Sequence, residues 1–218
     1  MAEYFGKHHS YLVPQDNYYT RKISNALKDA LSLNPGQAIL EIGCGAGRFS
    51  IPLLDQGLSM TCIDTSRELL DVFQDHLTPQ RRAQILCQDV YHFNGRFDAV
   101  IGFFVLHHFD DHRPLFDKFR SFLNEGGSIG FIEPNPFNPL YYLAPFFYKG
   151  ISFLDELYYM CDRDRLARNL SAAGFKGIQV KKFGFLPPQI MNLKIGPALD
   201  RLTEKCVPRL CHLVMAHL

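Results

Sequence analysis

Residues 38–54 read AILEIGCGAGRFSIPLL, an apolar strand pattern that runs directly into a loop with glycine at positions 43, 45 and 47. Glycine accepts positive φ angles and lets the backbone approach a ligand with no Cβ in the way. A tight strand-to-helix turn needs glycine as well, so the loop alone leaves a plain turn and a ligand-binding loop as open alternatives. In open α/β sheets, ligands bind at the carboxyl ends of strands, which is where this loop lies.

Apolar segments and helical patterns alternate on both sides of this loop. A helix is expected from Asn17 to Leu33, because Ile23, Leu27 and Leu31 recur at helical spacing before an Asn-Pro-Gly stop. The expected strands that follow are residues 38–43, 59–64, 83–89, 97–104 and 128–133, and the expected helices are 48–57, 66–77 and 112–124. Apolar strands separated by helices predict a doubly wound, Rossmann-like α/β fold with a sheet covered on both faces.

The pattern changes beyond residue 133. Nine aromatic residues fall within residues 137–159, a segment also broken by prolines. Helical and strand patterns then return: helices are expected at 162–175 and 197–206, and strands at 177–185 and 210–218.

Composition indicates one large domain. The chain has 218 residues, of which 47% are hydrophobic, and its net charge of +1 argues against a protein that coats nucleic acid. The charge is uneven, since residues 1–161 carry 13 Lys and Arg against 18 Asp and Glu, while residues 162–218 carry 10 against 4. The basic last quarter is either an ordinary solvated face or a docking surface for an anionic substrate or head group.

Cysteine usage and the N-terminus predict a cytoplasmic protein. The six cysteines form no C-x-x-C pair, which favours reduced thiols. The opening residues MAEYFGKHHSYL lack the cationic head and apolar run of a signal peptide, and no 18 apolar residues run uninterrupted. The histidines show no Cys/His spacing typical of a metal site, so none is expected.

Three residues near strand ends narrow the class of ligand. Arg48 occupies the position where a dinucleotide fingerprint needs a small residue, so the ligand is not held through a pyrophosphate. Asp64 ends the second expected strand and can accept hydrogen bonds from both hydroxyls of a ribose. Asp89 ends the third and can accept one from an adenine amine, with the Val90 amide offered to a ring nitrogen. Each acid also has a plain alternative: Asp64 as the cap of the next helix, and Asp89 as a turn residue.

Five segments together resemble the class I S-adenosylmethionine-dependent methyltransferases, in particular the small-molecule group with an LHH element after the fourth strand. The segments are EIGCGAG (41–47), CIDTS (62–66), QDV (88–90), FDAVIGFFVLHHF (97–109) and LNEGGSIGFIEP (123–134). The resemblance implies a seven-stranded, mostly parallel sheet with an antiparallel last strand, and S-adenosyl-L-methionine as cofactor. It implies one domain divided into an N-terminal lid and helix (1–33), a cofactor-binding core (34–133), a substrate lid (134–162) and C-terminal helix and strands (163–218).

The resemblance also implies a set of cofactor-binding residues. The glycine loop would fold around the methionyl part, Asp64 would bind the ribose, Asp89 the adenine, and Glu41 would order the loop and the cofactor's amino group. The full expected set is Glu41, Gly43, Cys44, Gly45, Gly47, Asp64, Thr65, Asp89, Val90, Gly102, Phe103, Tyr19 and Arg21. In the N-terminal segment, Tyr18, Tyr19 or Arg21 would meet the cofactor's carboxylate. A sulfonium cation without phosphates suits a loop backed by carboxylates.

His107 and His108 are the candidate catalytic residues, since an imidazole can take the proton of a hydroxyl acceptor. The alternative is that they shape the cofactor pocket and pack the next helix. Residues 102–105 read GFFV where enzymes acting on planar nitrogens tend to carry an NPPY-like motif, so O- or C-methylation is favoured.

The aromatic segment suggests the acceptor. It either covers an apolar, lipid-like or quinone-like small molecule or packs as ordinary core, and contact with a membrane surface is a further interpretation. No DNA partner is expected. An RNA methyltransferase and an inactive methyltransferase-fold binding protein are the alternative functions, and the sequence leaves the oligomeric state open.

Overall fold

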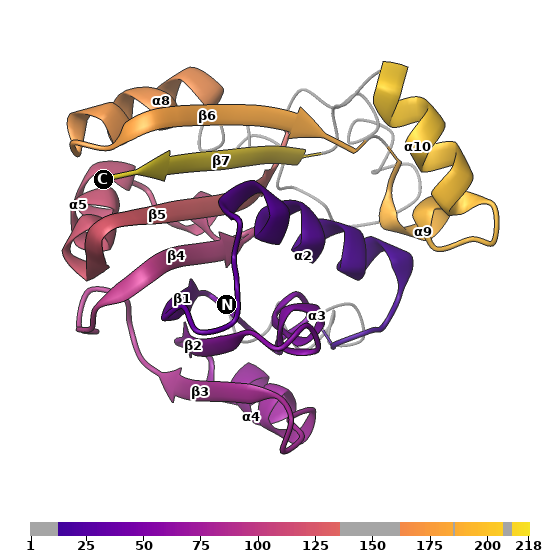
Figure 1. The fold of residues 1–218 in the computed structure, drawn as a ribbon, viewed down its shortest axis with the longest axis horizontal. Coiled ribbons are helices and arrows are strands. Elements are labelled where there is room, and N and C mark those ends of the chain that lie inside the picture. Colours follow the sequence, from indigo (N-terminus) through magenta and orange to yellow (C-terminus); the bar gives the residue numbers. More distant parts are fainter. Residues whose placement is uncertain (1–12, 136–161, 185, 207–210) are drawn as a thin grey trace.

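The computed structural model describes residues 13–135, 162–184, 186–206 and 211–218 (Figure 1). The strands are β1 (Ile39–Ile42), β2 (Ser59–Asp64), β3 (Arg82–Cys87), β4 (Phe97–Phe103), β5 (Leu123–Pro134), β6 (Lys176–Phe183) and β7 (Cys211–His217). The helices are α2 (Tyr18–Leu31), α3 (Ser50–Leu54), α4 (Arg67–Asp75), the 3-10 turn η1 (Leu106–His108), α5 (His112–Phe122), α8 (Arg163–Ala172), α9 (Pro188–Met191) and α10 (Gly196–Cys206).

The strands form one sheet in the order β3-β2-β1-β4-β5-β7-β6. Neighbours from β3 to β5 are parallel, whereas β7 runs antiparallel to both β5 and β6. The register places Ile42 opposite Ile63 on one side and Gly102 on the other, so the carboxyl ends of β1, β2 and β4 meet at one edge. The predicted fold class, including the antiparallel last strand, is confirmed.

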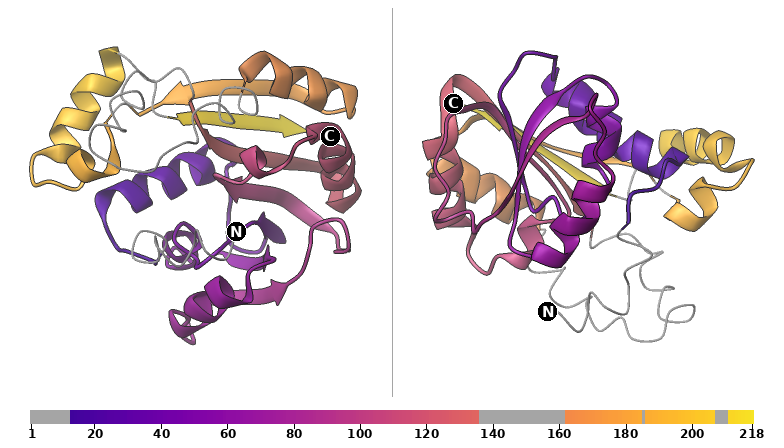
Figure 2. Two further views of the ribbon diagram at one scale, coloured as in Figure 1. Left: turned by 180° about the vertical axis from the view of Figure 1, so that it is seen from behind. Right: turned by 90° about the horizontal axis from the view of Figure 1, so that it is seen from below.

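Helices cover both faces of this sheet (Figure 2). On one face, Leu27 of α2 and Leu53 of α3 pack in a core cluster that includes Ile39 of β1. On the other, Phe116 of α5 and Leu170 of α8 belong to the cluster that contains Leu40. Adjacent residues of β1 therefore serve opposite cores, as the two-residue period of a strand requires.

Capping side chains fix several helix starts. Asn17 Oδ1 accepts the Thr20 amide at 3.0 Å, and the Asn17 amide donates to the Thr20 hydroxyl at 3.4 Å, which makes a reciprocal capping box for α2. Ser66 accepts the Leu69 amide at the start of α4, and Asp111 accepts the Arg113 amide at the start of α5. These are local interactions, which is why sequence patterns place the helix starts well.

Some boundaries differ from the sequence-based expectation. The helix expected over 48–57 is confined to α3, and the sequence pattern does not predict α9. The expected fifth strand begins at residue 128, but β5 begins at Leu123 because Leu123 pairs with Phe97 ahead of an irregularity in the register. The substrate lid expected at 134–162 lies almost entirely outside the described residues, so the lid and the domain division stay predictions.

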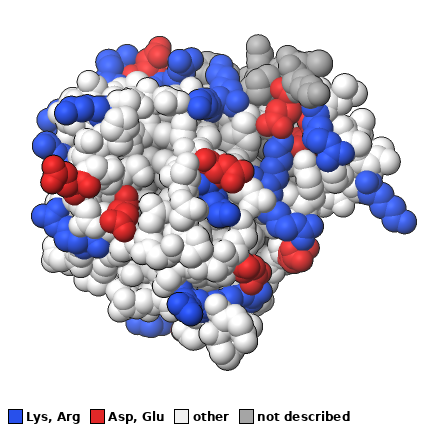
Figure 3. Space-filling view, in the orientation of Figure 1, with Lys and Arg blue, Asp and Glu red and all other residues white. Residues whose placement is uncertain are grey.

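The basic character of the last quarter has a partial structural explanation. Lys and Arg gather along the upper edge of the molecule in Figure 3, where Figure 1 places α8 and β6. Strand β6 is an edge strand, and Lys176, Lys181 and Lys182 on it are exposed. Lysines on an edge strand hinder pairing with another chain, so an ordinary solvated edge accounts for these three charges.

Candidate active site

The glycine loop after β1 combines packing constraints with one open position. Gly43, Gly45 and Gly47 have φ angles of 67°, 52° and 80°. A Cβ at Gly43 would lie 2.4 Å from Val105 Cγ2, and one at Gly47 would lie 2.3 Å from the Phe73 ring. A Cβ at Gly45 would meet only a leucine methyl, at 3.7 Å. Packing thus explains two of the glycines, whereas Gly45 borders open space that a ligand can use.

Asp64 ties this loop to the end of β2. Its Oδ2 accepts the Gly45 amide at 2.8 Å, and its Oδ1 accepts the Ser66 amide at 2.8 Å. The capping bond to the Leu69 amide belongs to Ser66, so Asp64 is not itself the cap of α4. Each carboxylate oxygen has a second lone pair, which leaves acceptor capacity for a ribose hydroxyl. The neighbouring Thr65 is exposed at the same edge.

Asp89 lies at the next strand end, in a turn. Its Oδ1 accepts the Tyr91 amide at 2.7 Å, and its backbone carbonyl accepts the amides of His92 and Phe93 at 3.1 Å. The side chain is 48% exposed, whereas Val90 is buried. Asp89 and Asp64 lie on the same sheet edge, since Cys87 at the end of β3 pairs with Asp64. The turn interpretation describes the contacts of Asp89, and its role toward adenine stays a prediction.

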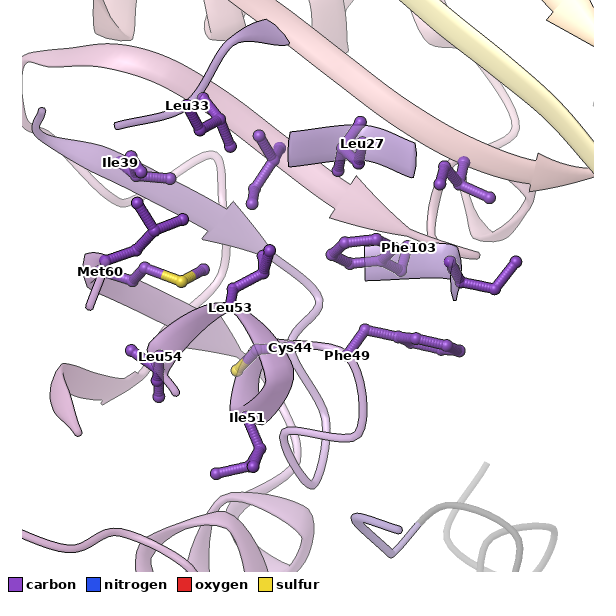
Figure 4. Close-up of a cluster of buried hydrophobic side chains, with 14 of the residues drawn as sticks. Leu27, Leu33, Ile39, Cys44, Phe49, Ile51, Leu53, Leu54, Met60 and Phe103 are labelled. Carbon is purple, nitrogen blue, oxygen red and sulfur yellow. The ribbon is translucent and has the colours of Figure 1, made fainter. Parts of the chain in front are cut away.

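A buried carboxyl group and two thiols lie beneath the loop. Glu41 is 2% exposed, and the Cys62 thiol donates to its Oε2 at 3.6 Å. Burial raises the pKa of Glu41 to about 7, against the opposing effect of Ser50 and Cys62. The Cys44 side chain points into the core, so this residue offers the site only its backbone (Figure 4). A cation above the loop would favour the charged form of Glu41.

The end of β4 supplies an aromatic wall. Phe103 is buried and stacks on Phe49 of the loop with ring centroids 5.1 Å apart (Figure 4). Phe104 has a φ of 54°, a conformation that costs energy for a bulky side chain and is found preferentially at functional sites. A Cβ at Gly102 would lie 2.7 Å from Val105 Cγ1, so packing requires this glycine. Nothing in the local sequence identifies Phe104 as a special position.

His107 is paired with a buried carboxylate that no sequence pattern indicates. His107 Nδ1 lies 2.8 Å from Oε2 of Glu133, the penultimate residue of β5. Glu133 is fully buried, and its Oε1 accepts the amides of Val105 and Leu106 at 2.8 and 2.7 Å. Burial by itself raises the pKa of Glu133, but the His107 ring and the two amides outweigh it, and the net effect is a lowered pKa. A negative charge is therefore held against His107.

The other histidines of this region play different parts. His108 is exposed, with its ring 4.2 Å from the ring of His107. Partial removal of the ring from water, and then the neighbouring His107, lower the pKa of His108. Because the side chain is still exposed, the surrounding water limits this effect. His112 is fully buried, and its Nε2 lies 2.9 Å from the Leu106 carbonyl oxygen. This contact joins the start of α5 to η1 and stabilises the turn that carries His107.

The N-terminal helix brings Tyr19 to the loop but not Arg21. The Tyr19 ring meets Phe49 edge-on at 6.0 Å, and the Arg48 guanidinium carbon lies 5.2 Å from each of these two ring centroids. Arg21 is 52% exposed and pairs with Asp16. The cation next to Tyr19 is thus Arg48, and the expected role of Arg21 gains no support from a contact.

One surface cavity lies away from these residues. It measures about 430 Å³ and is lined by residues 37–39, 59–61 and 82–84 with Phe97. These are the amino-terminal ends of β1, β2, β3 and β4, opposite to the glycine loop. It is therefore not the candidate cofactor site.

Comparison with known proteins decides the family. A family model described as "Methyltransferase domain" matches residues 15–180. The chain belongs to the class I S-adenosylmethionine-dependent methyltransferases. The family expected from the five sequence segments is confirmed, and members of this methyltransferase family are enzymes of class EC 2.1.1.

Curated relatives match this methyltransferase over part of their length. It is 29% identical over 104 residues to the ubiquinone biosynthesis O-methyltransferase of Coxiella burnetii, and the aligned region covers 46% of this chain and 44% of the relative. It is 27% identical over 135 residues to an uncharacterized methyltransferase of Mycobacterium bovis, covering 59% and 68%. The chain thus aligns with less than half of the Coxiella relative.

Solved structures agree on the methyltransferase fold. An S-adenosylmethionine-dependent methyltransferase from Mesorhizobium loti superimposes with a TM-score of 0.63 at 21% identity, over 89% of this chain and 96% of that one. The magnesium protoporphyrin IX methyltransferase of Synechocystis, with bound S-adenosylhomocysteine, gives 0.65 at 16% identity, over 99% and 94%.

Metal binding and membrane crossing each require a particular grouping of residues. Within the part of the chain that the structure describes, no group of three or more His, Cys, Asp or Glu is arranged to hold a metal ion. Among the same residues, no helix combines the length and apolar character needed to cross a membrane.

Proposed function

We propose that this methyltransferase transfers the methyl group of S-adenosylmethionine to an oxygen or carbon atom of a small, apolar or lipid-like acceptor. The observation that carries the proposal is the glycine loop: Gly45 borders open space and its amide is held by Asp64. A loop of bare backbone anchored to a carboxylate fits a cationic nucleoside ligand without phosphates.

The chain's own residues divide the work of binding. Asp64 would accept the ribose hydroxyls, Asp89 and Val90 would meet the adenine, and Glu41 would support the loop from beneath. When bound, S-adenosylmethionine would supply an electrophilic methyl group, which the acceptor atom attacks in line while the carbon–sulfur bond breaks and the sulfur leaves as a neutral thioether. Most of the remaining task is to hold two partners in line and to exclude water, and the buried rings of Phe49 and Phe103 favour a dry site.

His107 is the proposed general base for a hydroxyl acceptor. Its Nδ1 faces Glu133, so Nε2 is the atom that takes the proton. The charge on Glu133 fixes the ring's orientation and stabilises the imidazolium that forms, as in other sites where a third group orients the base. His108 is the less favoured base because it is exposed and its pKa is lowered.

Two observations support an apolar acceptor. Nine aromatic residues lie within residues 137–159, which fall outside the described residues. The Coxiella burnetii relative is named for O-methylation in ubiquinone biosynthesis. A quinone-like or lipid-like phenol is therefore the acceptor class that we would test first, and contact with a membrane surface is a separate proposal, since methyl transfer to a dissolved acceptor does not require it.

Calorimetry tests the cofactor site. S-adenosylmethionine should bind the wild-type chain and NADH should not, and Asp64→Ala should weaken binding of S-adenosylmethionine at least tenfold by removing a charge-assisted contact. Asp71→Ala, an exposed acid on α4, is the matched control and should bind normally. Heat with NADH alone would overturn the enzyme class, and normal binding by Asp64→Ala would overturn the site.

Methyl transfer from labelled S-adenosylmethionine then tests the acceptor. Label should enter apolar phenols rather than RNA. Label in RNA would favour the RNA methyltransferase alternative, and cofactor binding without transfer to any acceptor class would favour the inactive binding protein.

A further inference from the structure

Helix α10 turns its acidic residues toward the protein. Asp200 is fully buried, forms an ion pair with Lys22 of α2, and accepts the Tyr18 hydroxyl at 3.1 Å. Glu204 Oε2 lies 2.7 Å from Lys22 Nζ, and its Oε1 accepts the Gly184 amide at 2.8 Å. These contacts fix the rotation of α10, because the helix cannot turn Asp200 outward without separating Lys22 from both of its carboxylate partners.

The same rotation places large apolar side chains in water. Six large apolar residues of the described chain are exposed, and five of them lie between positions 190 and 202. They are Ile190 (38% exposed), Leu193 (55%), Ile195 (63%), Leu199 (38%) and Leu202 (63%), and we call them the α9–α10 patch. Single exposed leucines need no explanation, but five within thirteen residues are an unusual concentration of exposed apolar side chains.

The two exposed charged residues within residues 188–204 are both cations. Lys194 and Arg201 are exposed within it, whereas the only acids of the described residues 188–204 are Asp200 and Glu204, which face Lys22. In Figure 3 the outer side of the lobe where Figure 1 draws α9 and α10 is mostly uncharged, with Lys and Arg side chains projecting from it, while acidic side chains are visible on the side toward the rest of the molecule. An apolar face bordered by cations is complementary to the surface of an anionic bilayer.

We propose that the α9–α10 patch docks this protein on an anionic lipid bilayer. The leucines and isoleucines would enter the boundary between head groups and acyl chains, and Lys194 and Arg201 would meet lipid phosphates. A few apolar side chains flanked by cations are enough for shallow insertion at an anionic bilayer surface, and the oligomeric state tests a second copy of this chain as the alternative occupant. The surface also adjoins the candidate site, since Asn192 Oδ1 accepts the Tyr19 amide at 3.0 Å. An acceptor dissolved in the bilayer would then reach the site directly, a consequence that rests on the proposed function.

The absence of tryptophan from the sequence allows a sensitive test. Leu202→Trp places a single reporter in the α9–α10 patch, and Tyr91→Trp places one at the remaining exposed apolar position, after β3. Vesicles of phosphatidylcholine with phosphatidylglycerol should shift the emission of Leu202→Trp to the blue and leave that of Tyr91→Trp unchanged. Vesicles of phosphatidylcholine alone should give a smaller shift. An unchanged Leu202→Trp spectrum with anionic vesicles would overturn the proposal.

Sedimentation with the same vesicles gives a second readout. Replacing Lys194 and Arg201 by Gln should lower the vesicle-binding constant about tenfold or more, and high salt should weaken wild-type binding in the same direction. Leu193→Ser with Ile195→Ser should also lower it, while thermal unfolding stays near the wild-type temperature because both side chains are exposed. Equal binding by these variants, or a wild-type dimer that they dissociate, would assign the surface to something other than lipid. Because neither assay uses the cofactor, failure here leaves the proposed methyl transfer untouched.

Discussion

Replacement of Glu133 by Gln tests the pair at the centre of the proposed mechanism. The carboxylate accepts two backbone amides and the His107 ring from a fully buried position. A glutamine of the same shape can still accept the two amides through its neutral oxygen, but its amino group then faces His107. Hydrogen bonds to a charged group contribute roughly 1.5–3 kcal/mol and neutral ones about 1 kcal/mol. The free energy of unfolding should therefore fall by about 2 kcal/mol at neutral pH.

The loss should depend on pH with a definite sign. The folded-state pKa of Glu133 is lowered, so its charge contributes stability above the unfolded pKa and loses that contribution as pH falls through the folded pKa. The difference between wild type and Glu133→Gln should be full at pH 7 and shrink in acid, below the ordinary pKa of a glutamate.

The kinetic effect should be larger than the stability effect. A glutamine amino group donates to Nδ1, which forces the proton of a neutral His107 onto Nε2 and removes the proposed base. A general base contributes about 100-fold or more, so kcat for a phenolic acceptor should fall by that order, with cofactor binding unchanged.

Denaturant titrations at several pH values and steady-state methyl transfer measure both effects. Glu125→Gln is a matched control, because Glu125 lies on the same strand and is exposed. A Glu133→Gln variant as stable as wild type at pH 7 would refute the reasoning about the buried charge. A destabilised variant with wild-type kcat would instead refute His107 as the base.

Three further predictions concern the loop, its buried acid and the helix contact. Gly45→Ala should abolish cofactor binding measured by calorimetry. Gly36→Ala is the control: Gly36 has a φ of 97° and no neighbouring atoms near a Cβ, so this variant should lose similar stability and still bind the cofactor. Equal binding by both variants would show that Gly45 is not part of the site. The pKa of Glu41 is raised to about 7, so its neutral form stabilises the folded state and this stability is lost as pH rises. Between the ordinary pKa of a glutamate and pH 7, the free energy of unfolding of wild type should fall by about 3 kcal/mol relative to that of Glu41→Gln. Parallel plots of unfolding free energy against pH for the two proteins would contradict the raised pKa. Lys22→Met should lower the free energy of unfolding by about 3–5 kcal/mol because it leaves buried Asp200 unpaired, and Asp200→Asn in the same chain should recover part of that; no loss in denaturant titration would show that water reaches Asp200.

Residue types at short spacing are enough to predict the fold class and the class of ligand. Strands, helices and the loop glycines follow from local patterns, and the carboxyl ends of parallel strands must meet at one edge. That is why the sequence alone places Asp64 at the same end of the sheet as the glycine loop, and the Gly45 contact agrees with that placement. The capping residues of α2 and α4 are equally readable, because their bonds span three residues.

Features that join distant residues depend on the tertiary structure. Glu133 contacts His107, which lies 26 positions earlier in the chain. Arg48, and not Arg21, lies against the Tyr19 ring. Lys22 pairs with the acidic residues of α10, and this orientation of the helix leaves its leucines exposed. No local pattern encodes these pairings, since each depends on how strands and helices pack against one another. The leucines of α10 by themselves would predict a helix that buries them and exposes Asp200. The ion pair of Asp200 with Lys22 decides the orientation instead, because leaving a buried charge unpaired costs more free energy than exposing a leucine.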